Sequence, residues 1–185
     1  MKSFARNFRY WLPALAWLGV IAFESFRLSS AVTGSWLSGM LQFLNVQISA
    51  ENFAHLHHFL RKAGHLTGYG LLSVLLFRSW FHTLADSSEA STAGGSRRAL
   101  EDKLDAHRNS RRLDPRWRSL ALALSLTLLT AILDEWHQSF DLSRTGTLWD
   151  VVIDLAGGVC FLGIALFGFK LWQRRPVEEL EEVSA

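Results

Sequence analysis

The sequence contains a single cysteine, Cys160, which lies inside an apolar block. One cysteine cannot form an intramolecular disulfide, and cysteine usage therefore says nothing about the redox compartment. The sequence also lacks a phosphate-binding glycine loop, a nucleophile elbow and the paired His and Cys spacing of a metal centre. The sequence therefore shows none of the usual signatures of nucleotide hydrolases, serine hydrolases or zinc-binding domains. No metal site and no cofactor is predicted.

Apolar residues are abundant and gather in blocks. They make up 49% of the 185 residues, with 8 Trp and 13 Phe. A soluble domain of similar composition would spread them in periodic stripes. Each block has approximately the 17–25 residues with which a helix crosses a bilayer, and the blocks are 10–26, 63–81, 117–133 and 151–172. The sequence predicts an all-α integral membrane bundle of four transmembrane helices.

The first block also has features of a signal peptide. Lys2, Arg6 and Arg9 precede it, and residues 29–31 (SSA) could serve as a cleavage site. Against cleavage, the apolar stretch is long and bulky and is interrupted by Glu24. We therefore expect a retained helix.

Basic residues are unevenly distributed between the intervals that separate the blocks. Three Lys or Arg residues precede the first block, nine lie from Arg78 to Arg118, and three lie at or after the end of the fourth block, from Lys170 to Arg175. The intervals 27–62 and 134–150 hold three and one. Because basic loops stay in the cytoplasm, both termini and the long interval 82–116 are predicted to lie on the cytoplasmic side of the inner membrane.

The predicted organisation is one membrane domain with an insertion. Residues 1–81 hold the first two helices with an outer segment, residues 117–172 hold the last two, and residues 173–185 form a charged cytoplasmic tail. Between them, residues 82–116 are rich in Ser, Ala, Gly and charge, which predicts a flexible cytoplasmic insertion. The arginines of this insertion are explained by its predicted cytoplasmic location, where basic residues face anionic lipid. No nucleic-acid partner is therefore expected.

The outer interval between the first two blocks carries apolar residues at helical spacing from Trp36 to Leu44. This pattern predicts a short interfacial or re-entrant helix. A second helix is expected to begin near Ser49 and to run into Arg61. Three histidines in this interval are interpreted as surface residues: His55, His57 and His58.

Polar residues gather at the ends of the blocks that face outward in this topology. The second block begins with Lys62, His65 and Tyr69, which share one helical stripe at i, i+3 and i+7. The stretch AILDEWHQSF, residues 131–140, brings carboxylates, an imidazole and an amide to the outer end of the third block. These groups are therefore predicted to lie at a similar depth.

The first and fourth blocks add charges at the same depth. Asp150 and Asp154 lie one turn apart on one face of the fourth block, Glu24 ends the first, and Arg144 lies in the short loop before the fourth. A charge costs roughly 2.5–3.5 kcal/mol at the centre of a spanning segment, and less near an interface. Single residues of this kind often only pair and fix helix ends, whereas their gathering on one side favours an outward-facing site.

Two segments of the sequence resemble the VanZ-like membrane protein family: RKAGHLTGYGLLSVLLF (61–77) and DEWHQSFDLSRTGTLWDVVIDLAGGVCFLGI (134–164). The family's pattern has Lys-x-x-His-x-x-x-Tyr at the start of one helix, then Asp-Glu-x-x-Gln, a loop Arg, an Asp and, one turn later, an Asn. The matching residues are Lys62, His65, Tyr69, Asp134, Glu135, Gln138, Arg144 and Asp150. Asp154 stands where the family usually shows Asn, which adds a carboxylate. The resemblance covers most of the chain except 82–116.

The resemblance implies a role in the bacterial cell envelope, since the family's namesake is associated with reduced susceptibility to the glycopeptide antibiotic teicoplanin. We expect an outward-facing polar pocket that binds a lipid head group, a lipid-linked saccharide or a lipophilic glycopeptide. Its expected binding residues are the eight matching residues together with Asp154. The sequence leaves the oligomeric state open.

The alternative is a membrane-embedded hydrolase or transferase that acts on a phosphate or glycosyl group at the outer leaflet. Glu135, Asp134 and His65 are then the candidate acids and bases. The same residues could bind a divalent cation through oxygen ligands. A third hypothesis is a structural protein whose ion pairs fix helix register. Transport is disfavoured because the polar groups lie at one end and no inverted repeat is visible.

Overall fold

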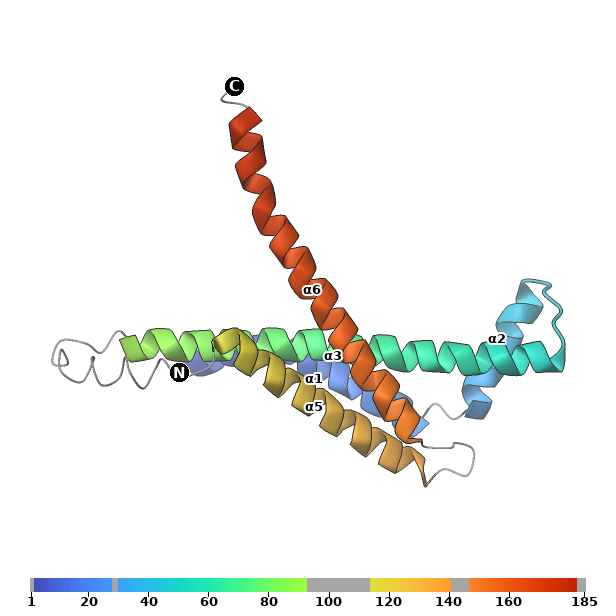
Figure 1. The fold of residues 1–185 in the computed structure, drawn as a ribbon. Helices are drawn as coiled ribbons and strands as arrows, with labels where there is room; N and C mark the ends of the chain where they lie inside the picture. The colour runs from blue at the N-terminus through green and yellow to red at the C-terminus, as the bar shows by residue number, and fades with distance from the viewer. Residues whose placement is uncertain (1, 28–29, 93–113, 141–146, 183–185) are drawn as a thin grey trace.

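The computed structural model describes residues 2–27, 30–92, 114–140 and 147–182. These residues contain helices and no strand, which confirms the all-α prediction. The helices are α1 (Lys2–Arg27), α2 (Ser30–Phe43), α3 (Ala50–Thr92), α5 (Pro115–Gln138) and α6 (Leu148–Glu182) (Figure 1).

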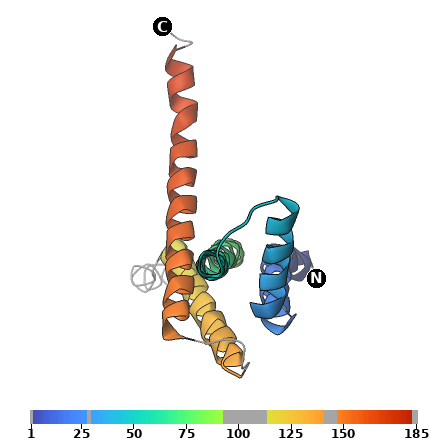
Figure 2. The same ribbon diagram turned by 90° about the vertical axis from the view of Figure 1, so that its right-hand side faces the viewer.

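Helix α3 is the central element of the bundle. It packs against α1 on one side and against α5 and α6 on the other, and Figure 2 shows α3 end-on between them. Tyr69, Leu72 and Leu76 of α3 are buried in the core. The buried residues that complete this core are Ala14 and Ile21 of α1, Ala123 and Ala131 of α5, and Val151 of α6. The core therefore runs along one long helix.

Two of the described helices are long and apolar enough to cross a membrane alone, namely Pro115–Gln138 and the Leu148–Leu171 part of α6. Residues Asn7–Arg27 of α1 meet this criterion only together with α2, and this pair is bent by 94°. By length and apolarity, the described residues thus provide two candidate spans, or three if the bent pair counts as one span. The sequence predicted four. Helix α3 falls short because its apolar run is short: Lys62 and His65 precede it, and Arg78 and His82 follow it.

The outside of the bundle is strongly apolar. Phe23, Trp136, Ile164 and Phe167 are each 60–70% exposed, and the later part of α6 extends away from the other helices (Figure 1). Contiguous apolar surface of this kind is unfavourable in water and is typical of helices surrounded by lipid. The fold is that of a membrane protein.

One predicted boundary differs from the structure. Helix α3 continues through residues 82–92, where a flexible insertion was expected to begin. Its contact with α1 reaches the first two of these residues: Trp11 Nε1 donates to Thr83 Oγ1 at 3.2 Å, and Tyr10 stacks on His82. Helix α6 continues to Glu182, so most of the charged tail is helical. The rest of the insertion, residues 93–113, lies outside the described residues.

The two helices predicted in the outer interval are present. Helix α2 covers the apolar stretch around Trp36, and α3 begins at Ala50, where the Ser49 hydroxyl accepts from the Asn52 amide at 3.2 Å. Between them Asn45 adopts a φ of 58°, a left-handed conformation that Asn tolerates better than most residues. The turn folds α2 back beside the start of α3 (Figure 2).

Helices α3 and α6 touch at a glycine. A Cβ on Gly157 would lie 2.2 Å from the backbone oxygen of Leu66, a distance that no side chain permits. Beside this contact, Ser73 Oγ donates to the carbonyl of Gly158 at 3.0 Å. Small residues allow helix backbones to approach closely within lipid. This approach places Asp154, one turn before Gly158, against α3.

Candidate functional site

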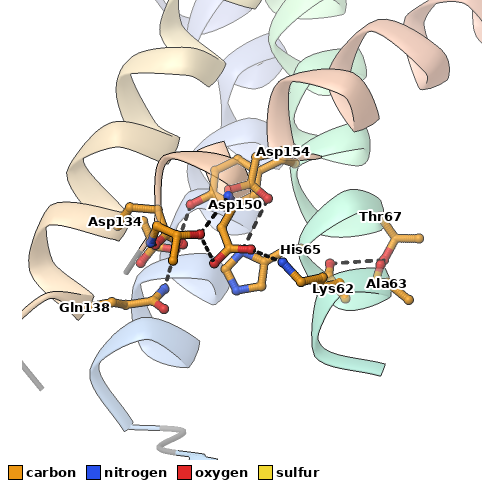
Figure 3. A network of polar contacts seen from close by, with 12 residues as sticks. Lys62, Ala63, His65, Thr67, Asp134, Gln138, Asp150 and Asp154 are labelled. Atoms are coloured by element: carbon orange, nitrogen blue, oxygen red, sulfur yellow. Dashed lines mark hydrogen bonds and ion pairs between the residues drawn. The ribbon is translucent and has the colours of Figure 1, made fainter. Parts of the chain in front are cut away.

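The end of α5 and the start of α6 meet the first half of α3 in a network of polar side chains (Figure 3). Every predicted binding residue that the structure describes belongs to it, and Arg144 lies outside the described residues. The members, called the polar network below, are Lys62, His65, Tyr69, Asp134, Glu135, Gln138, Asp150 and Asp154 together with Thr147.

Asp150 joins α3 to the first turn of α6. Lys62 Nζ donates to Asp150 Oδ1 (Figure 3), and Thr147 Oγ1 donates to Asp150 Oδ2 at 3.0 Å. The Asp150 amide in turn donates to Thr147 Oγ1 at 3.3 Å. This is a capping arrangement, in which a carboxylate also lies favourably near the positive end of the helix dipole. Both oxygens of Asp150 are thus used to hold the fold.

Glu135 ties the end of α5 to the start of α6. Its Oε2 accepts from the Thr147 backbone amide at 3.0 Å, and the residue is only 7% exposed. Sequence reasoning missed Thr147, although the Thr-x-x-Asp spacing of residues 147–150 is a recognisable helix-start signal.

Asp134 forms a second connection between α5 and α3. Its Oδ2 accepts from Tyr69 Oη at 2.9 Å and from Gln138 Nε2 at 2.9 Å. Its Oδ1 is buried and accepts no hydrogen bond from any residue that the structure describes. Asp134 therefore has one satisfied and one unsatisfied oxygen.

His65, Glu135 and Asp154 form the least compensated part of the network. His65 Nδ1 lies 3.3 Å from Asp154 Oδ1, but without the angles of a hydrogen bond. Asp154 is fully buried, and neither of its oxygens accepts a hydrogen bond within the described parts of the chain. One ligand-type atom from each of the three residues lies within 4.8 Å of the others. An imidazole nitrogen and two carboxylate oxygens are donors that a divalent cation accepts.

A cavity of about 250 Å³ adjoins the network between α1, α2, α3 and α5. Apolar side chains form part of its wall, including those of Ile21, Leu37 and Leu60. Its polar wall consists of Glu24, Ser25, Thr33, His57, Arg61, His65, Tyr69, Asp134 and Gln138. The cavity therefore combines an apolar surface with groups of both charges, and it shares four residues with the network.

The interpretation of His57 as a surface residue is wrong. His57 lines the cavity, and its Nε2 lies 2.8 Å from Thr33 Oγ1, which connects α3 to α2. Nearby, Arg61 Nη1 donates to Ser30 Oγ at 2.7 Å. Partial burial, together with the charges of Arg61 and His58, holds the pKa of His57 below its usual range, so its imidazole is neutral at neutral pH. The sequence could not show this because the contact depends on where α2 folds back.

The sequence pattern of the VanZ/LLP1 family matches residues 8–171, nearly the whole described bundle. The chain belongs to the VanZ/LLP1 family. The match takes in every member of the polar network and every residue that lines the cavity. No curated protein and no solved structure matches this VanZ/LLP1 chain. The resemblance seen in two segments is thereby confirmed at the level of the family.

Proposed function

We propose that this VanZ/LLP1 protein binds the phosphate-bearing head group of an envelope lipid or lipid-linked saccharide in the cavity between α1, α2, α3 and α5. The observation that carries the proposal is the cavity itself, which combines apolar walls with basic side chains next to the polar network. A lipophilic glycopeptide of the teicoplanin type is the other ligand with this mixture of chemistry. In this proposal the protein belongs to the cytoplasmic membrane of a bacterial envelope.

The proposed topology has four crossing helices, α1, α3, α5 and α6, with both termini and the 93–113 interval in the cytoplasm. Helix α3 is included because it packs along the two candidate spans and α1. Basic residues are concentrated at the termini and in the long interval, as expected of cytoplasmic loops. The cavity and the polar network then face the outer side.

Cysteine labelling tests this topology. In a Cys160→Ser background, a cysteine at Gln47 is expected to react with a membrane-impermeant maleimide in intact cells, because residue 47 joins the outer ends of α2 and α3. A cysteine at Gly95 is expected to react only after lysis. Labelling of the Gly95 position from outside would contradict the proposed orientation.

The wall chemistry of the cavity favours a phosphate ligand. Arg61 presents a guanidinium, the group best suited to phosphate geometry, and His57 and His65 lie on the same wall. The neighbouring Leu60 and Ile21 provide apolar surface for an acyl or prenyl chain. The wall also holds two carboxylates, Glu24 and Asp134, and Oδ2 of Asp134 already accepts hydrogen bonds from Tyr69 and Gln138.

Lipid binding in detergent tests the proposal. Native mass spectrometry with phosphatidic acid as the probe is expected to show binding that the Arg61→Gln variant weakens by about 10-fold or more, since a hydrogen bond to a charged group contributes roughly 1.5–3 kcal/mol. Arg27→Gln is the matched control, because Arg27 is exposed at the end of α1 and does not line the cavity. Equal loss in both variants, or equal binding of phosphatidylcholine, would contradict a phosphate site.

A second candidate function is acid–base catalysis on a bound phosphate or glycosyl group. It is favoured by the buried Glu135, which has a carboxylate oxygen within 4.8 Å of a ring nitrogen of His65, a residue that lines the cavity. If the protein turns over phosphatidic acid or a lipid-linked phosphate, Glu135→Gln is expected to lower the rate by about 10²–10⁴-fold. Phosphate release is the measurement, and unchanged turnover in Glu135→Gln would remove Glu135 from the mechanism.

A further inference from the structure

We propose that His65, Glu135 and Asp154 bind a divalent transition-metal cation, such as Zn²⁺ or Mn²⁺, where α3, α5 and α6 meet. This proposal does not depend on the head-group ligand. It rests on the three facing donor atoms and on the complete burial of Asp154, whose oxygens find no hydrogen-bond donor in the described residues.

The spacing of the donors is close to that of a coordination shell. Ligand atoms about 2.1 Å from a common cation lie roughly 3.0–3.5 Å apart when their bonds meet at about 90–110°. His65 Nδ1 and Asp154 Oδ1 are 3.3 Å apart, and they face each other without forming a hydrogen bond. The Glu135 oxygen lies within 4.8 Å of both residues, so a small side-chain movement completes the set. Two polar atoms that face each other without a hydrogen bond are expected around an ion.

The charge balance also favours a cation. Buried carboxylates are normally paired, hydrogen-bonded or bound to metal, because an isolated buried charge is strongly destabilised. Lys62, the nearest ammonium, is already bound to Asp150. Glu135 receives one backbone amide, and Asp154 faces only the His65 ring. A divalent ion would neutralise both carboxylates at once.

The donor set selects the class of ion. An imidazole nitrogen is a good ligand for Zn²⁺ and other transition metals, whereas Mg²⁺ and Ca²⁺ prefer oxygen alone. The set comprises one imidazole and two carboxylates, which suits Zn²⁺ and Mn²⁺. His65 also lines the cavity, whereas Asp154 is fully buried and does not line it, so the ion would lie next to the cavity at His65.

Metal analysis of the purified full chain tests this site. Protein stripped with EDTA, incubated with Zn²⁺ or Mn²⁺ and desalted is expected to retain a single ion per chain in elemental analysis. Co²⁺ added to the stripped protein is expected to show the visible absorption of a nitrogen- and oxygen-ligated ion. Asp154→Asn and Glu135→Gln, which are nearly isosteric, are expected to weaken binding by more than ~100-fold, since loss of a mere supporting group costs about 10–100-fold.

Asp134→Asn is the matched control, because it removes a carboxylate from the same network but not from the three-residue set. It is expected to keep the ion. Retention of the ion by both Asp154→Asn and Glu135→Gln, or no retention by the wild-type protein, would overturn the proposal. Circular dichroism of each variant confirms that a lost ion reflects a lost ligand, and two independent variants keep the test decisive if one fails to fold.

Discussion

Replacing Gly157 by alanine is expected to lower the melting temperature of the protein in detergent and to reduce its folded yield. The new Cβ would lie 2.2 Å from the Leu66 carbonyl oxygen, so the backbones of α3 and α6 must separate. Overpacking of a close contact typically costs about 1–3 kcal/mol, and we expect the upper part of that range because neither backbone can rotate away.

Gly163→Ala is the control for this prediction. Gly163 lies further along the same helix, and a Cβ there would meet nothing within 4 Å. Alanine is the better helix former, so Gly163→Ala is expected to leave the melting temperature unchanged or to raise it slightly. Equal behaviour of the two variants would show that α6 does not pack on α3 at Gly157.

Removing the ammonium of Lys62 is expected to destabilise the bundle strongly. The Lys62→Met variant leaves Asp150 half-buried without its ion-pair partner; the two side chains are 32% and 22% exposed. Breaking a buried pair costs about 3–5 kcal/mol and a surface pair about 0–1 kcal/mol, so a loss of ~1–3 kcal/mol is expected for this partly exposed pair. The measurement is chemical or thermal unfolding in detergent.

The double variant Lys62→Met with Asp150→Asn distinguishes an ion pair from ordinary packing. Once the carboxylate is neutral, the missing ammonium matters less, and part of the lost stability is expected to return. If the two substitutions instead add without interaction, the Lys62–Asp150 contact contributes nothing specific to the fold.

Much of the polar network could be predicted because helical spacing alone places its members. The i, i+3, i+7 pattern puts Lys62, His65 and Tyr69 on one stripe of α3. In the structure each of the three meets a different aspartate, in the order Asp150, Asp154 and Asp134. Helical periodicity predicts that the three residues share one face of α3. Which aspartate each of them contacts depends on how closely α5 and α6 approach α3. For α6, that distance is set by the contact of Gly157 with Leu66, and the partner in this contact cannot be read from local sequence.

The cavity wall formed by α2 could not be predicted from local pattern. His57 and Arg61 reach Thr33 and Ser30 only because the chain turns back at Asn45. The extension of α3 beyond residue 81 was missed for a related reason: polar composition predicted a loop, whereas packing against α1 supports the helix as far as Thr83. In both places a contact between distant segments decides the local structure.

The central claim is that the buried carboxylate of Asp154 serves a ligand, whereas Asp150 serves the fold. The surroundings of the two carboxylates differ accordingly. Asp150 accepts hydrogen bonds on both oxygens, whereas Asp154 faces only the His65 ring at 3.3 Å, without hydrogen-bond geometry, among the described residues. Residues kept for function are often costly for stability, and removing them can stabilise a protein. The two aspartates lie one turn apart on α6, which makes them a matched pair.

The most direct test is the melting temperature of two variants in detergent with EDTA present. Asp154→Asn is expected to melt higher than the wild-type protein, because it removes a fully buried charge that His65, 3.3 Å away and without hydrogen-bond geometry, compensates only in part. Asp150→Asn is expected to melt lower, because it breaks the bond with Lys62 and weakens the start of α6. A fall for Asp154→Asn as large as that for Asp150→Asn would show that Asp154 is a structural residue and would contradict the account.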